Sequence, residues 1–96
     1  MSIDVSKLDL SQLHAKLLAI VRYVAESSNR KENLHRLTPD FPLFGGTESL
    51  GLDSLDILDI ALEVEKEFGI SFHEEEDQAE FATVSSLAQC LRSRFA

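Results

Sequence analysis

Three segments of this 96-residue chain repeat apolar residues at three- and four-residue steps, and this feature constrains the fold most strongly. Such spacing places apolar side chains on one face of an α-helix, which is buried against another element. The apolar positions are Leu10, Leu13, Leu17, Ile20, Val21 and Val24; then Ile57, Ile60, Ala61, Val64 and Phe68; then Val84, Leu87, Ala88, Leu91 and Phe95. A short helix is also expected within residues 74–81. The sequence therefore predicts an all-α four-helix bundle, as a single domain over residues 1–96.

A long irregular segment, from about Arg30 to Leu52, is expected between the first two helices. The first helix should begin after a Ser11 N-cap and weaken near residues 27–29, where Ser and Asn compete for backbone hydrogen bonds. The segment that follows contains Pro39, Pro42, Gly45, Gly46 and Gly51, which interrupt regular structure. Its apolar residues, Leu37, Phe41, Leu43, Phe44 and Leu50, are expected to hold it against the core. A long ordered loop in a small domain is often functional.

The second helix is expected to begin at Asp53 or Ser54 and to run to about Phe68, with Gly69 as its C-terminal stop. Thr83 is expected to cap the last helix. These two boundaries leave residues 70–82 as a connection, in which the short helix lies.

The second helix carries more leucine than one buried face requires. On a helical wheel at ~100° per residue, Leu55, Leu58 and Leu62 form a second stripe about 130° from the first. The remaining arc is covered by Asp56, Asp59, Glu63 and Glu67. An apolar patch bordered by charge indicates a protein interface. Leu58 and Leu62 are expected to be exposed, whereas the long loop is expected to cover Leu55.

Ser54 lies in the first turn of this helix. Backbone N–H groups there lack partners within the helix, and the helix dipole favours negative charge, so a phosphodiester on the hydroxyl would be stabilised. Asp53 either caps the helix or helps a visiting enzyme to hold a metal–phosphate substrate. Taken alone, an Asp-Ser pair before a helix is an ordinary N-cap.

The stretch Leu50-Gly51-Leu52-Asp53-Ser54-Leu55-Asp56 resembles the prosthetic-group site of acyl carrier proteins, whose signature is a Gly-Leu-Asp-Ser-Leu run that opens the second helix. The similarity continues through Leu58, Asp59, Ala61, Leu62, Glu63, Glu65, Phe68, Gly69 and Ile70. The resemblance implies that a separate phosphopantetheinyl transferase attaches 4′-phosphopantetheine from coenzyme A to Ser54. The terminal thiol of this arm would then hold an acyl group as a thioester.

The resemblance also implies that the second helix is the main recognition surface. By position, the residues involved are Asp53, Asp56, Leu58, Asp59, Leu62 and Glu63. The implied partners are the transferase and the acyl-transferring and condensing enzymes, which have basic docking surfaces. Lys66 stands where an acidic residue is common, a difference that bears on partner choice. The long first loop is similar to that of carriers in specialised acyl or polyketide pathways, rather than bulk fatty-acid synthesis.

Charge narrows the range of partners. The chain has 17 acidic residues against 9 Lys plus Arg, a formal net charge of −8. Such a surface repels phosphate backbones, so nucleic-acid binding is not expected, and it favours a monomer that attracts basic surfaces. Residues 1–10 lack the features of a signal peptide, and no apolar run is long enough to span a membrane. We therefore expect a cytoplasmic protein.

Catalysis and metal binding are not expected. A hydrolase elbow reads Gly-x-Ser-x-Gly, but Leu52 and Asp56 occupy the glycine positions around Ser54. The three histidines are distant in sequence, and the acidic cluster at 73–77 lacks the spacing of a zinc helix or a calcium loop. Cys90, the single cysteine, is expected to be a small core residue rather than a nucleophile.

Two carrier-like alternatives stay open. The first is a stand-alone peptidyl or aminoacyl carrier, although those domains usually have a Gly-Gly-x-Ser setting, and Leu52-Asp53 together with the strong acidity favours the acyl type. The second is a carrier-like binding module in which Ser54 is never modified. An intact mass measurement separates this second alternative from the others.

Overall fold

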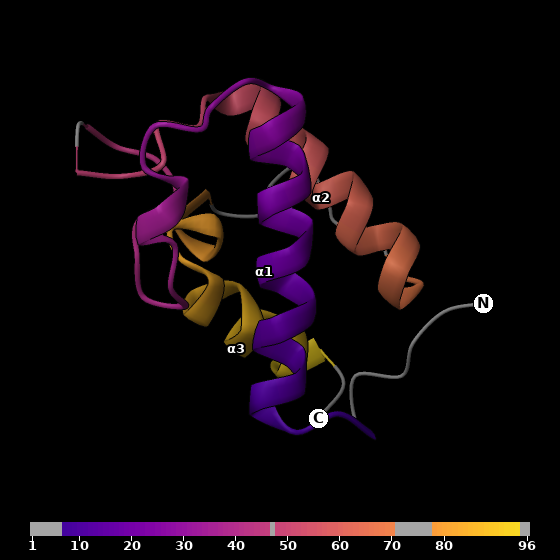
Figure 1. Ribbon diagram of the computed structural model, residues 1–96. Helices are drawn as coiled ribbons and strands as arrows, with labels where there is room; N and C mark the ends of the chain where they lie inside the picture. Colours follow the sequence, from indigo (N-terminus) through magenta and orange to yellow (C-terminus); the bar gives the residue numbers. More distant parts are fainter. Residues whose placement is uncertain (1–6, 47, 71–77, 95–96) are drawn as a thin grey trace.

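The computed structural model describes residues 7–46, 48–70 and 78–94. In these ranges the elements are α1 (Leu10–Ser27), the 3-10 helix η2 (Leu34–Arg36), α2 (Ser54–Phe68), the 3-10 helix η3 (Gln78–Phe81) and α3 (Val84–Arg94). Helix α1 packs against both α2 and α3, and α3 packs against η3 (Figure 1). Helices and turns account for all regular structure in the described ranges, which confirms the all-α prediction.

The four-helix form is not confirmed. Where a fourth helix was expected, within residues 74–81, the described part holds only the four-residue η3. Residues 74–77 lie outside the described residues. None of the helices in the described ranges combines the length and apolar character that a membrane span requires.

Helix α1 begins earlier than predicted, because Asp9 rather than Ser11 is its N-cap. Asp9 Oδ1 accepts a hydrogen bond from the backbone N–H of Gln12 at 2.8 Å, and Gln12 Oε1 accepts one from the N–H of Asp9 at 3.0 Å. This capping box satisfies two backbone donors at once, which a lone serine cap does not. Ser11 therefore lies inside the helix.

The predicted ends of α2 are confirmed. Asp53 is the N-cap, and Gly69 adopts a left-handed conformation with φ of 67° and donates its N–H to the carbonyl of Glu65 at 2.9 Å. Glycine adopts this conformation without strain and so ends the helix. The predicted cap of α3 is also confirmed, because Thr83 Oγ1 accepts a hydrogen bond from the backbone N–H of Ser86 at 3.0 Å.

The core lies between the three α-helices and the loop that joins α1 to α2. Its buried apolar residues in the α-helices are Leu13, Leu17, Val21, Val24 and Ala25; Ile57, Ile60, Val64 and Phe68; and Val84, Leu87, Ala88 and Leu91. Ile20 and Ala61 pack against it and are partly buried, Leu10 is 44% exposed, and Phe95 lies outside the described residues. The helical spacing in the sequence thus identified most of this core.

The loop between α1 and α2 is held against the core as predicted. Leu43 and Leu50 are buried, while Leu37, Phe41 and Phe44 are partly buried against it. Backbone bonds fix its path: the N–H of Leu43 donates to the carbonyl of Ala82 at 2.9 Å, and the N–H of Leu52 donates to the carbonyl of Leu43 at 3.1 Å. These bonds connect the loop to the start of α3 and bring the chain to the start of α2.

Candidate functional site

The candidate site is the start of α2, where two carboxylates cap the helix reciprocally. Asp53 Oδ1 accepts a hydrogen bond from the backbone N–H of Asp56 at 2.9 Å, and Asp56 Oδ2 accepts one from the N–H of Asp53 at 3.1 Å. The pair satisfies backbone donors that helix geometry leaves unpaired. It fixes Ser54 as the first residue of the helix.

Arg30, just beyond the end of α1, binds both carboxylates. Its Nη2 lies 3.1 Å from Asp53 Oδ2, and its Nε lies 3.3 Å from Asp56 Oδ2. The hydrogen bond from the Asp56 backbone N–H lowers the pKa of Asp53, and the positive charge of Arg30 lowers this pKa further. Asp53 is therefore ionised at neutral pH, next to Ser54.

Asp56 is buried, so the prediction that its side chain lies on the exposed recognition surface is wrong. Only 4% of the residue is exposed. Besides its contact with Arg30, Asp56 Oδ1 accepts a hydrogen bond from the hydroxyl of Ser28, the C-cap residue of α1. A buried carboxylate needs such partners, because removing an unpaired charge from water is costly. Asp56 thus joins the end of α1 to the start of α2.

Ser54 is exposed, and its hydroxyl forms no hydrogen bond with any residue that the structure describes. It occupies the first helical position, at the positive end of the helix dipole. A phosphate ester on this oxygen would face solvent and lie in a favourable field. The site therefore fits a prosthetic group that is attached through phosphate.

The second leucine stripe of α2 lies on the surface. Leu55, Leu58 and Leu62 are 69%, 54% and 46% exposed. This confirms the predicted exposure of Leu58 and Leu62. The expectation that the loop covers Leu55 is wrong, because Leu43 and Leu50 of the loop are buried in the core instead. Asp59 beside the stripe is exposed, and Glu63 is partly exposed.

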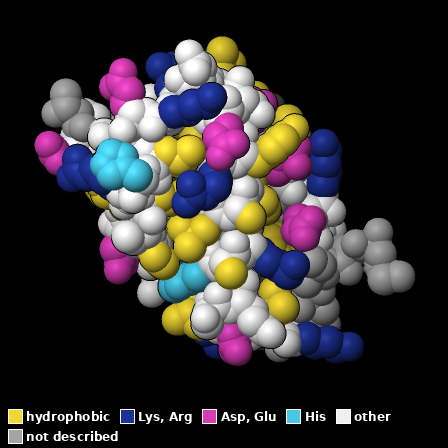
Figure 2. Space-filling view, in the orientation of Figure 1, with side chains coloured by type: hydrophobic (Ala, Val, Ile, Leu, Met, Phe, Trp, Pro, Cys, Tyr) yellow, Lys and Arg dark blue, Asp and Glu magenta, His cyan; other side chains and the backbone are white. Residues whose placement is uncertain are grey.

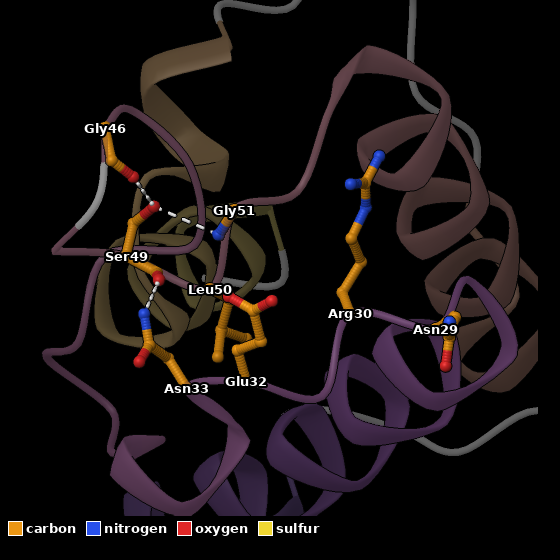
Figure 3. A pocket seen from close by; sticks show the side chains of 8 residues that line it. All are labelled: Asn29, Arg30, Glu32, Asn33, Gly46, Ser49, Leu50 and Gly51. Atoms are coloured by element: carbon orange, nitrogen blue, oxygen red, sulfur yellow. Dashed lines mark hydrogen bonds between the residues drawn. The ribbon is translucent and has the colours of Figure 1, made fainter.

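A hydrogen-bonded turn precedes α2 and borders a cavity of about 230 Å³. Ser49 Oγ donates to the carbonyl of Gly46 at 2.8 Å and accepts from the N–H of Gly51 at 3.0 Å, while Asn33 Nδ2 donates to the carbonyl of Ser49 at 2.8 Å (Figure 3). Asn29, Arg30, Glu32 and Asn33 form another wall of this cavity. Gly51 has a φ of 76°, which a side chain would strain. The turn gives the chain a defined path into α2.

Sequence reasoning missed Ser28 and Arg30 as parts of the site. Both lie more than 20 residues before Asp56, and no periodicity links them to α2. One available signal was the Asp53-x-x-Asp56 spacing, which resembles a capping box and indicates that Asp56 faces the helix start.

Neither of the described histidines, His14 and His35, is hydrogen-bonded to Ser54. His73 and the acidic cluster at 73–77 lie outside the described residues. Within the described ranges, no group of three or more His, Cys, Asp or Glu side chains could hold a metal ion.

The Cys90 thiol is partly buried and donates a hydrogen bond to Glu80 Oε2 at 3.1 Å. Burial, together with the neighbouring carboxylate, raises the pKa of this thiol to about 12. The thiol therefore stays protonated at neutral pH and is a poor nucleophile.

Comparison with known proteins agrees with this geometry. Residues 32–91 match the family model described as "Phosphopantetheine attachment site". The chain is also 42% identical over 64 residues to a protein named "Acyl carrier protein homolog" from Mycoplasma genitalium (strain ATCC 33530 / DSM 19775 / NCTC 10195 / G37). This alignment covers 67% of the present chain and 70% of the relative. No solved structure matches the chain significantly.

Proposed function

Because this chain belongs to the acyl carrier protein family, we propose that Ser54 is the residue to which its 4′-phosphopantetheine is attached. Members of this family are carriers and not enzymes. The observation that supports Ser54 is its exposed hydroxyl at the first position of α2, within the matched region and directly after the Asp53 cap. When bound, the arm supplies a thiol that holds an acyl group as a thioester.

The residues around Ser54 have two tasks in this proposal. The first turn of α2 stabilises the phosphodiester through unpaired N–H groups and the helix dipole. Arg30 offsets the negative charge of Asp53, which would otherwise repel that phosphodiester. Asp56 positions both groups by joining the start of α2 to the end of α1.

We further propose that the exposed side of α2 is the surface that partner enzymes recognise. The leucine stripe Leu55, Leu58 and Leu62 supplies apolar contact, and Asp59 and Glu63 attract basic surfaces. Asp56 is removed from this surface because it is buried. The partners would be the phosphopantetheinyl transferase and the acyl-transferring and condensing enzymes that exchange the cargo.

The pathway also belongs to the proposal. The long loop between α1 and α2 favours a specialised acyl or polyketide pathway over bulk fatty-acid synthesis. The alternative is a stand-alone carrier of peptidyl or aminoacyl groups. The cytoplasmic location and the monomeric state remain predictions from the sequence.

The test is the intact mass of the protein after incubation with coenzyme A and a broad-specificity phosphopantetheinyl transferase. We expect the wild type to gain one phosphopantetheine and Ser54→Ala to gain none while it stays folded by circular dichroism. Ser11→Ala, which removes an exposed serine from α1, is the matched control and should load normally. A folded wild type that gains no mass would leave the unmodified binding module as the better assignment.

A further inference from the structure

A groove lies between α1 and α2, beside the leucine stripe. Its volume is about 290 Å³. It is lined by Tyr23 and Ser27 of α1 and by Asp59, Leu62, Glu63 and Lys66 of α2. Figure 2 shows hydrophobic, acidic and basic side chains close together where α2 lies beside α1. We refer to it as the Tyr23 groove.

The apolar part of the groove is the ring of Tyr23 and the side chain of Leu62. Tyr23 is 61% exposed, and Leu62 is about half exposed. The neighbouring positions Val21 and Val24 already supply the buried face of α1, so folding does not require an aromatic ring at residue 23. Exposed aromatic residues are enriched at protein interfaces and often contribute most of their binding energy.

The charged part of the groove has a negative charge without a counterion. Asp59 is exposed and forms no ion pair or hydrogen bond with any described residue. Glu63 Oε1 lies 3.3 Å from Lys66 Nζ, and the lysine side chain is 74% exposed. Such surface pairs are weak, so Lys66 does not prevent a partner from binding here. Two carboxylates against one ammonium group leave an excess of one negative charge.

We infer that the Tyr23 groove binds an arginine side chain of a partner enzyme. A guanidinium group is planar and permanently charged, so it stacks on an aromatic ring and binds a carboxylate through two parallel hydrogen bonds. Tyr23 offers the ring, Asp59 offers the free carboxylate, and Leu62 contacts the aliphatic part of the side chain. The inference rests on the proposed function, because Leu62 belongs both to this groove and to the proposed recognition surface.

Geometry disfavours a lysine side chain as the occupant of the groove, and charge disfavours a second copy of this chain. A lysine would gain the attraction to Asp59 but not the stacked and bidentate geometry. A second copy of this chain is disfavoured because each copy carries a net charge of −8. The groove would therefore select among basic partners by their arginine content rather than by charge alone.

The test uses two labelled helical peptides of leucine, alanine and basic residues, identical except that one has arginine where the other has lysine. By fluorescence anisotropy, we expect the wild-type chain to bind the arginine peptide about threefold more tightly than the lysine peptide. Tyr23→Ala should remove this preference, and Tyr23→Phe should keep it because the ring face remains. Asp59→Asn should weaken binding of the arginine peptide more than Glu32→Gln, which removes an exposed carboxylate outside the groove.

Equal affinity of the wild type for both peptides, or a preference that Tyr23→Ala leaves unchanged, would overturn the inference. A dimer in sedimentation equilibrium that Tyr23→Ala dissociates would assign the groove to a second copy and also overturn it. Intact mass after phosphopantetheine transfer is measured on the same samples. The absence of a mass gain would contradict the proposed function, whereas the absence of an arginine preference would contradict this inference. The two failures are therefore distinguished.

Discussion

Helices α2 and α3 are capped in the same way but present different surfaces. Each begins with reciprocal hydrogen bonds between its cap and its third residue, which are Asp53 and Asp56 in α2 and Thr83 and Ser86 in α3. In the described part of α3, the large apolar residues are buried, whereas α2 exposes three leucines beside its buried face. Packing accounts for the apolar residues of α3. Those of α2 exceed what folding needs, which is the expected property of a binding helix.

The caps differ in charge as well. The cap of α3 is neutral, and Ser86 Oγ also donates to the backbone carbonyl of Glu80 at 2.9 Å. The cap of α2 consists of two carboxylates, which Arg30 joins to the end of α1. The start of α2 therefore depends on charge in a way that the start of α3 does not.

The largest expected difference in stability is between a variant that truncates a buried leucine and one that truncates an exposed leucine. Leu87→Ala in α3 should lower the free energy of unfolding by about 2–5 kcal/mol, because it leaves a cavity in the core. Leu58→Ala in α2 should change it by less than about 0.5 kcal/mol, because the side chain is more than half exposed. Urea denaturation followed by circular dichroism measures both. Similar losses in the two variants would show that the α2 leucines stabilise the fold.

The next largest difference in stability is expected between variants of a buried and of an exposed carboxylate of α2. Asp56→Asn should lower the free energy of unfolding by about 1–2 kcal/mol, because the cap and the bonds from Ser28 and Arg30 are weakened. Asp59→Asn removes the same charge from an exposed site and should change stability by less than about 0.5 kcal/mol. Unfolding of the two variants at the same urea concentration would show that the contacts of Asp56 with Ser28 and Arg30 do not stabilise the fold.

The smallest effect is a pH dependence located at Asp53. Its pKa in the folded state lies below the ordinary value of 3.8, so the folded state binds this proton more weakly than the unfolded chain does. The stability it contributes is complete above pH 3.8 and is lost as pH falls through the lowered pKa. Asp53→Asn keeps a good N-cap and removes the titration.

The measurement is urea denaturation of wild type and Asp53→Asn between pH 6 and pH 2.5. We expect the difference in free energy of unfolding between the two proteins to be constant above pH 3.8. Below that pH, the wild type should lose stability relative to Asp53→Asn. A difference that stays constant over the whole range would contradict the role of Asp53 as a charged cap.

The sequence was most informative where a local pattern decides the structure. The ends of α2 follow from Asp53 and Gly69, which act within one turn of the helix. The exposure of Leu58 and Leu62 follows from the helical wheel, because one helix face was already filled by apolar residues. Ser54 could be singled out because an N-terminal helical position and a family motif coincide there.

The sequence was least informative where two distant segments meet. The helical wheel placed Asp56 on a polar arc, but Ser28 and Arg30, which follow α1, contact Asp56 and bury it. The wheel treats one helix in isolation and contains no information about the path of a long loop. Leu55 was misplaced for the same reason, since the loop passes into the core and leaves this side chain exposed.

The central claim is tested most directly by locating the added group in the loaded protein. Cleavage after Arg36 and Lys66 releases a peptide with two serines, of which Ser49 is buried in a hydrogen-bonded turn and Ser54 is exposed. Tandem mass spectrometry of this peptide distinguishes them. The account predicts phosphopantetheine on Ser54 alone. Modification of Ser49, or of any other residue, would contradict it.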